Sequence, residues 1–457
     1  MTTPPATISG APQPFGGELL RPADPGYDDA RRIHNGMIDK RPGLIARCRS
    51  SADVAAVVVF ARDGGHELSV RGGGHNVAGR AVTEGGVMLD LSAMRAVAVD
   101  PAARTARAQG GARWGDVDRE TQRHGLAVTG GMISTTGIGG LTLGGGLGWL
   151  MGRYGLTVDN LLSAEVVTAD GAVVTASASE HEDLFWALRG GGGNFGVVTS
   201  FEYRLHPVGP VVTGFRVVYP FSRAAEVLRA YRDFTASIPD ELTLNAALLH
   251  APDGSGVKLA GIVGCHVGPA EQAERDLAPL LALGSAEDVL AGPIEYTTLN
   301  SLLDAAYPRG ALNYWKSSFL DSFSDEAIAV MVDEFAACPS PSSAFVIENP
   351  HGEATSVPVE ATAVPFRAPG YNFLITSVWR DAAASEANVA WTRRAFEAVR
   401  PFAADRCYVN YLAGDEAAGG GRDPVRAAYG PNYERLVAVK RRYDPANLFR
   451  LNQNIRP

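Results

Sequence analysis

Glycine gathers in three stretches of the first half of this chain. It supplies 52 of the 457 residues, and the stretches are Arg71–Asn76 (RGGGHN), Thr129–Gly155 and Arg189–Gly196 (RGGGGNFG). Glycine adopts positive φ without steric cost and lets backbone approach a ligand closely, but it weakens the interiors of helices and strands. The pattern therefore predicts loops whose backbone N–H groups can converge on a phosphate. A set of tight turns in a β-rich domain is the alternative.

The pattern of helical and strand-like segments changes near Pro207. This change indicates two domains, and so does the length of the chain. Before that point, short β-branched runs alternate with short helical segments, and after it longer helical patterns alternate with strand-like segments. We expect a mixed α+β fold, in which an antiparallel sheet covered by helices forms the second part. The clearest expected helices are Ser51–Asp63, Glu182–Leu188 and Ala384–Val399, and the clearest expected strands are Val197–Tyr203, Ala344–Asn349 and Tyr371–Trp379.

Composition argues against several classes of protein. Basic residues number 41 against 50 acidic ones, for a net charge of −9, and no basic run interleaves with aromatics, so we expect no nucleic-acid partner. No apolar stretch reaches the ~18 residues that span a bilayer, and the N-terminus lacks a secretory pattern. The four cysteines are scattered without a CxxC, which predicts reduced thiols. We expect a cytoplasmic protein without a membrane partner or a bound metal.

The third glycine stretch contains a formal GxGxxG at Gly191, Gly193 and Gly196. It follows a helix-like segment and enters a strand, which is the reverse of the order that dinucleotide binding by a Rossmann fold requires. No P-loop, no GxSxG and no HExxH motif occurs in the sequence. These absences argue against the corresponding nucleotide-binding, hydrolase and metalloprotease functions.

His75 stands in the first glycine stretch, directly after an expected strand, Glu67–Val70. A histidine held there can be a ligand, a base, a covalent anchor or simply a hydrogen-bonded turn residue. In the second stretch, Ser134 and Thr135 add hydroxyl donors beside the glycines. A long loop rich in N–H and O–H groups suits a pyrophosphate without lysine.

The C-terminal part carries two polar motifs. Tyr408–Tyr411 (YVNY) is either a strand with alternating aromatics or the source of a phenol that acts as a general base. Asn452 and Asn454 would point the same way if the chain were extended there, and their amides could bind a polar ring edge.

Together these pieces resemble the berberine-bridge-enzyme-like branch of the vanillyl-alcohol oxidase/PCMH flavoprotein superfamily. The similarity covers nearly the whole chain, including RGGGHN, GGLTLGGGLGWL, DLFWALRGGGGNFGVVT and the terminal YDPANLFRLNQNI. It implies a PCMH-type FAD-binding domain over residues 1–209, with its core from about 40, and a substrate-binding domain over 210–406. It also implies a C-terminal segment, 407–457, that returns to the FAD domain.

The resemblance implies that His75 binds FAD covalently at the flavin 8α carbon. Many members add a second link from a cysteine before a Gly-x-Gly-Gly, but no cysteine occurs in 132–135, so we expect a single bond. The other residues expected to contact FAD are Arg71, Gly72, Gly73, Gly74, Asn76, Gly79, Gly131, Ser134, Thr135, Gly137, Gly139, Gly140, Gly144, Gly148, Tyr154, Asp159, Asn160, Gly196, Val197, Val198, Asn410, Asn452 and Asn454.

The implied reaction is removal of a hydride from a C–H next to an alcohol or amine of a small, secondary-metabolite-like molecule, with oxygen as the expected electron acceptor. Tyr408 or Tyr411 is the candidate base, and Lys316 is a candidate cation that would lower the pKa of a phenol. Tyr314–Lys316 and Tyr371–Asn372 are expected in the sheet that faces the flavin. The alternatives are an NAD(P)H-dependent flavin reductase of the same superfamily and a noncatalytic flavin-binding protein. A monomer and a homodimer are both compatible with the sequence.

Overall fold

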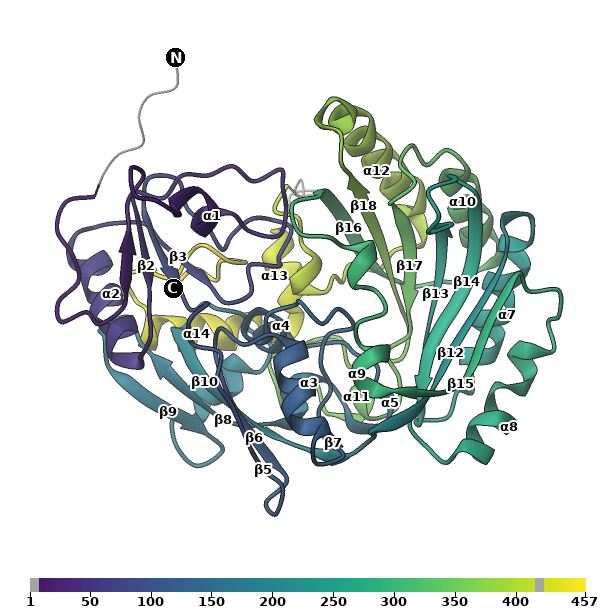
Figure 1. Ribbon diagram of the computed structural model, residues 1–457, viewed down its shortest axis with the longest axis horizontal. Coiled ribbons are helices and arrows are strands. Elements are labelled where there is room, and N and C mark those ends of the chain that lie inside the picture. Colours follow the sequence, from purple (N-terminus) through teal and green to yellow (C-terminus); the bar gives the residue numbers. More distant parts are fainter. Residues whose placement is uncertain (1–7, 416–422) are drawn as a thin grey trace.

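Four sheets and the helices packed on them make up the part of the chain that the computed structural model describes, residues 8–415 and 423–457 (Figure 1). The first sheet has the order β1-β2-β4-β3, the second β5-β6-β10-β8-β9, and a third pairs β11 with β7. Their strands are β1 Glu18–Leu20, β2 Leu44–Arg47, β3 Leu68–Arg71, β4 Val87–Asp90, β5 Val97–Asp100, β6 Thr105–Gln109, β7 Leu126–Ala127, β8 Leu161–Val167, β9 Val173–Ser177, β10 Val197–Arg204 and β11 His206–Pro207. The mixed α+β class predicted from the sequence is confirmed.

Six helices accompany these sheets in the described residues before β12. They are α1 Tyr27–Arg31, α2 Ser51–Asp63, α3 Trp114–Gln122, α4 Ile138–Gly144, α5 Met151–Tyr154 and α6 Glu182–Leu188. Helix α2 begins where the Ser50 hydroxyl accepts the N–H of Asp53 in a capping box, which satisfies a backbone donor that the first turn leaves free. The stretch 129–155, expected to be one long loop, contains α4 and α5. That expectation was wrong because the glycines of α4 remove side chains from a tightly packed helix.

The fourth sheet is antiparallel and has the order β15-β12-β14-β13-β17-β18-β16. Helices α7, α8, α10 and α12 pack on one of its faces (Figure 1). The elements of this region are β12 Val211–Pro220, α7 Ala224–Thr235, β13 Leu242–His250, β14 Lys258–His266, α8 Ala270–Leu281, β15 Asp288–Glu295, α9 Tyr296–Leu299, β16 Leu312–Leu320, α10 Asp325–Ala336, β17 Ala344–Glu348, α11 Glu353–Ser356, β18 Tyr371–Trp379 and α12 Ser385–Val399.

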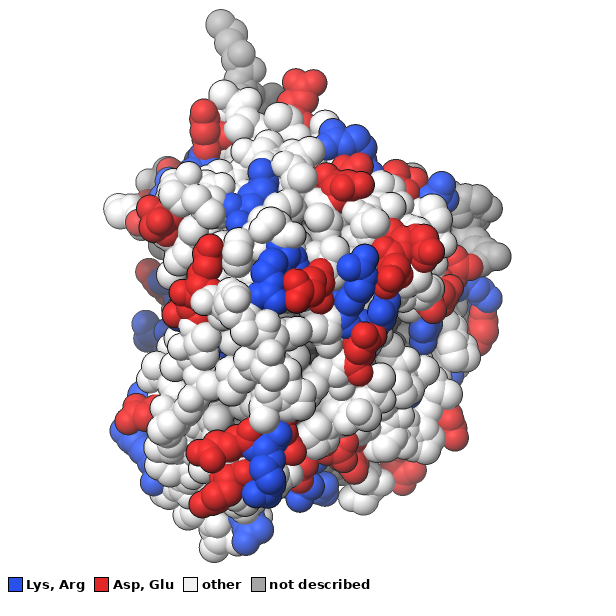
Figure 2. All heavy atoms as spheres, turned by 90° about the vertical axis from the view of Figure 1, so that its right-hand side faces the viewer, with Lys and Arg blue, Asp and Glu red and all other residues white. Residues whose placement is uncertain are grey.

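Alternation along these strands separates the face beneath the helices from the opposite face, which carries both apolar and polar side chains. Phe345 and Ile347 of β17, and Phe373 and Ile375 of β18, belong to the core beneath the helices. The residues between them, such as Val346 and Leu374, point to the opposite face, as side chains in a strand do. That opposite face looks toward the glycine-rich half of the molecule. On the outer side of this region, basic and acidic side chains are interspersed (Figure 2).

The C-terminal segment crosses back to the first two sheets. It contains the short 3-10 turn η6 Val409–Tyr411 and the helices α13 Pro424–Tyr429 and α14 Tyr433–Tyr443, and α14 packs against α6. Its anchor is Lys440 of α14, whose Nζ donates to Asp444 Oδ2 at 2.6 Å and to the carbonyl of Asn194 at 2.8 Å. Both side chains of this ion pair are fully buried.

Candidate functional site

A cavity of about 360 Å³ lies between the three glycine stretches and the face of the seven-stranded sheet that its helices leave uncovered. Its volume is in the range of small-molecule and cofactor sites. Of the residues expected from the sequence, those that line it are Gly72, Gly73, Gly74, His75, Asn76, Gly131, Gly137, Gly139, Gly140, Gly196, Val197, Val198, Tyr408, Asn410, Tyr411 and Asn452. The chain therefore brings residues from both ends of the sequence to one place.

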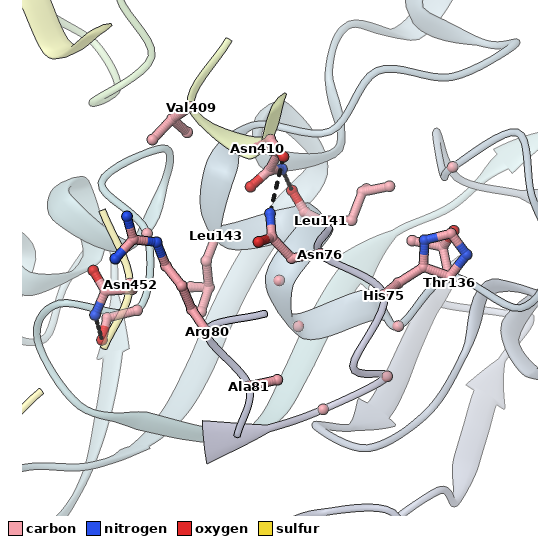
Figure 3. A pocket seen from close by; sticks show the side chains of 18 of the residues that line it. His75, Asn76, Arg80, Ala81, Thr136, Leu141, Leu143, Val409, Asn410 and Asn452 are labelled. Atoms are coloured by element: carbon pink, nitrogen blue, oxygen red, sulfur yellow. Dashed lines mark hydrogen bonds between the residues drawn. The ribbon is translucent and has the colours of Figure 1, made fainter. Parts of the chain in front are cut away.

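His75 lies at the turn that follows β3. Its Nε2 is buried and has no hydrogen-bond partner in the described part of the chain, and Figure 3 shows its imidazole beside Thr136. The ring stacks on His34, with centroids 3.9 Å apart. Burial, together with the neighbouring His34 and Arg113, lowers the pKa of His75 to about 3. The imidazole is therefore neutral near pH 7, with a lone pair available on one nitrogen.

The turn that carries His75 is held by an ion pair beneath it. Arg71, the last residue of β3, binds both carboxylate oxygens of Asp90 at the end of β4, with its Nε 3.0 Å from Oδ1. Burial opposes ionisation of Asp90, but Arg71 outweighs it and lowers the pKa of that carboxyl. Arg71 does not line this cavity, and its ion pair with Asp90 supports the loop that carries His75.

Backbone contact between two glycine stretches shapes the wall near His75. A Cβ on Gly137 would lie 2.3 Å from the N of Gly73, and a Cβ on Gly73 would lie 2.4 Å from the N of Gly137. Real Cβ atoms do not approach backbone that closely, so neither position tolerates a side chain without movement. At Gly140 and Gly193, by contrast, a Cβ would meet no atom within 4 Å.

These features fit FAD. Three glycine stretches present backbone along one elongated cavity, which extends from His75 to Phe449, Leu451 and Gln453 in the C-terminal tail. His75 lines this cavity, and its buried Nε2, which has no hydrogen-bond partner among residues 8–415 and 423–457, is a candidate nucleophilic atom. The residues that would hold the cofactor are those of the glycine stretches, His75 and Asn452, which donates to the carbonyl of Gly193 at 3.2 Å.

Tyr408 and Tyr411 lie together over the cavity, with ring centroids 4.9 Å apart. Tyr411 ends the turn η6 and Tyr408 directly precedes it, so the strand considered for YVNY was the wrong interpretation. The Tyr408 hydroxyl accepts the N–H of Gly146 and the side-chain amide of Asn410, each at 2.9 Å. Asn76 in turn donates to the carbonyl of Asn410 at 3.0 Å (Figure 3).

Glu348, the last residue of β17, is a cavity residue that the sequence analysis missed. Its Oε1 accepts the hydroxyl of Tyr411 at 3.0 Å, and its Oε2 accepts the amide of Asn372 at 2.7 Å. Burial raises the pKa of this carboxyl to about 7, although both hydrogen bonds work in the other direction. In the sequence, Glu348 is the single acidic residue at the end of the apolar run AFVIE. An acidic residue in that position is equally typical of the exposed end of a strand, so the sequence did not identify it as a cavity residue.

Lys316 does not act on these tyrosines as expected. It belongs to β16, where Trp315 lines the cavity, and the adjacent Lys316 points to the other face of the sheet. There its Nζ binds Asp415 at 2.6 Å and lies over the ring of Tyr314. Burial raises the pKa of Tyr408 to about 12 and that of Tyr411 well above its usual value, with Glu348 adding to the rise at Tyr411. The pKa values of Tyr408 and Tyr411 are therefore raised and not lowered, contrary to what was expected from Lys316.

Several residues expected to touch the cofactor have other partners outside this cavity. Asp159 binds the guanidinium of Arg367 through both oxygens, at 2.7 and 2.9 Å. Asn160 donates to the carbonyls of Tyr154 and Leu156. The sequence could not reveal these contacts because Arg367 lies 208 residues from Asp159.

The remaining expected residues lie outside the cavity and shape its surroundings. A Cβ on Gly144 would meet the amide of Asn410 at 2.3 Å, and one on Gly148 would meet the carbonyl of Gly130 at 1.9 Å. Ser134 donates its hydroxyl to Asp304 at 2.5 Å. The others are Gly79, which packs against Ile38, Tyr154, which stacks on His206, Thr135, which lines a second cavity of about 660 Å³ beside His34, and Asn454, whose Oδ1 is buried.

In residues 8–415 and 423–457, no helix combines the length and the apolar character that crossing a membrane requires. Within the same residues, no three His, Cys, Asp or Glu side chains come together as metal ligands.

Comparison with known proteins agrees with the FAD-binding family and the fold that the sequence and the cavity indicate. Residues 42–177 match the family described as FAD binding domain, and residues 407–456 match the family described as berberine and berberine like. The chain is 35% identical to the (R)-6-hydroxynicotine oxidase of Paenarthrobacter nicotinovorans, over 96% of this chain and 97% of that protein. It is 30% identical to an FAD-linked oxidoreductase of Dictyostelium discoideum, over 91% and 89% of the two chains.

Solved structures give the same result. The crystal structure of 6-hydroxy-D-nicotine oxidase from Arthrobacter nicotinovorans superposes with a TM-score of 0.85 at 31% identity, covering 97% of this chain and 98% of the other. A chitooligosaccharide oxidase superposes with a TM-score of 0.86 at 23% identity, covering 96% and 97%, which is a likeness of fold.

Proposed function

This chain belongs to the berberine-bridge-enzyme-like family of FAD-linked oxidoreductases, and on that premise we propose that it holds FAD through one bond to His75. We propose further that it oxidises a small organic molecule at a C–H next to an alcohol oxygen or an amine nitrogen, with oxygen as the electron acceptor. The NAD(P)H-dependent reductase and the noncatalytic protein are not favoured, because the relatives that span the whole chain are named oxidases or oxidoreductases.

The observation that carries the covalent bond is the unpartnered, buried Nε2 of His75 at the wall of the cavity. A buried nitrogen without a hydrogen-bond partner is costly unless a ligand uses it. The low pKa of His75 keeps the imidazole neutral and therefore nucleophilic. A second link is not proposed, since residues 132–135 read Met-Ile-Ser-Thr.

When FAD is bound, it supplies an acceptor for the hydride that leaves the substrate. The protein's part is to orient the substrate and to move the proton of its O–H or N–H group. Hydrogen bonding gives the two tyrosines different roles. Tyr408 already accepts two hydrogen bonds, so its own hydrogen is free to donate into the cavity.

Tyr411, in contrast, donates its hydrogen to Glu348 and keeps its oxygen lone pairs free to accept. A proton that leaves the substrate for the Tyr411 oxygen can be balanced by passage of the phenolic proton to Glu348. The carboxyl can hold that proton because burial raises its pKa to about 7. We therefore assign Tyr411 as the proton acceptor and Tyr408 as a donor that orients the substrate.

Denaturation in acid tests the covalent bond. We expect the yellow colour of the purified holoenzyme to precipitate with the polypeptide, whereas His75→Ala should release it to the supernatant. His124→Ala is the control, because His124 is an exposed histidine at the end of α3. Flavin released by the wild-type enzyme, or retained by His75→Ala, would contradict the proposal.

Stopped-flow mixing of the substrate-reduced enzyme with air-saturated buffer tests the acceptor. An oxidase returns to the oxidised spectrum within seconds and forms hydrogen peroxide, whereas a dehydrogenase returns slowly. The cytoplasmic location and the oligomeric state expected from the sequence stay predictions.

A further inference from the structure

A row of polar side chains crosses the cavity face of the seven-stranded sheet. Asn245 of β13 pairs directly with Glu348 of β17, which pairs directly with Asn372 of β18. Directly paired residues of antiparallel strands point to the same face, so the three side chains lie next to one another. Asn245 and Glu348 both line the cavity.

The side chains of this row carry several buried oxygen atoms that can accept hydrogen bonds. Asn245 is 4% exposed and Glu348 is 5% exposed. The Oδ1 atom of Asn245 has no hydrogen-bond partner within residues 8–415 and 423–457, and its amide is directed at the sulfur of Met132. Each oxygen of Glu348 accepts one hydrogen bond and has a second lone pair free. The row therefore calls for a ligand that donates more than one hydrogen bond.

Within the residues that the structure describes, no counter-ion offsets the carboxylate of Glu348. Glu348 makes no ion pair with any Lys, Arg or His of the described residues, and Lys316 projects from the other face of the sheet. Tyr307, Trp315 and Tyr411 are among the aromatic residues that line the same cavity. The ring centroids are 5.7 Å apart for Tyr307 and Trp315 and 6.1 Å apart for Trp315 and Tyr411. Aromatic rings next to a carboxylate favour an organic cation over a neutral group.

We propose that Glu348 and Asn245 form a subsite for a protonated amine of the substrate. The ammonium group would donate to the Glu348 carboxylate and to Asn245 Oδ1, and its carbon substituents would lie against Trp315 and Tyr411. An alcohol carries no charge and has a single donor, so it leaves one of these acceptors unsatisfied. The inference rests on the proposed oxidase function and narrows its substrate class from alcohols and amines to amines.

Benzylamine and benzyl alcohol are a matched pair of probes for this subsite. Each is titrated into the oxidised holoenzyme at pH 8, and the change in flavin absorbance gives the dissociation constant. We expect wild-type enzyme to bind the amine at least about tenfold more tightly than the alcohol, the ratio that one charged hydrogen bond supplies. Glu348→Gln should bring the ratio close to one.

Asp118→Asn is the control for burying an amide in place of an acid. Asp118 is also fully buried and accepts the amide of Asn300, but it lies in α3, outside the cavity. This variant should keep the wild-type ratio. If Glu348→Gln does not fold, Asn245→Leu decides the question, since it removes the second acceptor and should lower the ratio several-fold.

Equal affinities for the two probes in the wild type would overturn the inference, as would an unchanged ratio in Glu348→Gln or, where that variant does not fold, in Asn245→Leu. Failure to bind either probe would count against it too. Flavin content is recorded for each protein. Bound FAD with no preference for the amine rejects the amine subsite alone, whereas a wild-type protein that takes up no FAD rejects the proposed function.

Discussion

The two walls of the cavity are built on different principles. The wall formed by the three glycine stretches offers backbone and few side chains, and its shape depends on contacts as close as that between Gly73 and Gly137. The wall formed by the sheet offers side chains such as Asn245, Trp315 and Glu348, each set by strand alternation. Changes in the first wall should therefore affect whether FAD binds, and changes in the second should affect what is oxidised.

The largest effect should come from a single methyl group in the glycine wall. Gly137→Ala places a Cβ 2.3 Å from the backbone N of Gly73, and backbone cannot move aside as a flexible side chain can. We expect purified Gly137→Ala to contain almost no FAD, measured as the ratio of flavin to protein absorbance. Gly292→Ala is the control, because a Cβ there meets nothing within 4 Å. Normal flavin content in Gly137→Ala would show that this wall is more compliant than we infer.

The two buried acids Glu348 and Asp118 can be compared, because Glu348 lines the cavity and Asp118 lies outside it. Burial raises the pKa of Glu348 from 4.5 and of Asp118 from 3.8, each to about 7. Each therefore contributes stability that is present below its unfolded pKa and is lost as the pH rises through about 7. Each loss should be about 3–4 kcal/mol.

The measurement is the Tm of wild type, Glu348→Gln and Asp118→Asn between pH 4 and pH 8. Each substitution should flatten the fall in Tm across this window. A saturating amine should change the pH dependence of the wild type and of Asp118→Asn, because only Glu348 faces the cavity. An identical response of all three proteins to the amine would erase the distinction between the two acids.

Tyr411→Phe tests proton transfer next to the sheet wall, where the hydroxyl of Tyr411 donates to Glu348. Loss of the accepting oxygen should lower the rate constant of anaerobic flavin reduction about 100-fold, as removal of a general base does. Tyr408→Phe removes a donor and should cost about tenfold. Stopped-flow absorbance gives both values, and a larger loss in Tyr408→Phe would reverse the roles assigned to the two tyrosines.

The smallest effect should come from Lys316→Met. Because Lys316 lies on the face of the sheet away from the cavity, the rate of flavin reduction should stay within about twofold of wild type. Trp315→Leu, one residue earlier and on the cavity face, is the contrasting change and should weaken substrate binding. A large loss of rate in Lys316→Met would restore the cationic role first expected for it.

The sequence predicted helices and strands well where the periodicity of apolar residues and the flanking turn residues mark them. Helix α6 and strand β18 have the bounds expected from the sequence, because apolar periodicity and flanking turn residues mark them. The glycine stretches predicted a ligand, and the resemblance to a family gave its identity. Glu348, the pairing of Asp159 with Arg367, and the face on which Lys316 lies could not be predicted, since each depends on contacts between distant segments or on strand register.

The return of the C-terminal segment has a consequence for biosynthesis. Asn410 and Tyr411 lie in η6, Tyr408 directly precedes it, and Asn452 donates to Gly193. Residues 408–453 therefore complete a pocket whose other side is formed by residues far earlier in the sequence. The buried Lys440–Asp444 pair fastens this segment. On a translating ribosome the nascent chain therefore has no finished pocket until residues 408–453 have emerged, so FAD can enter the complete pocket only after that segment is made.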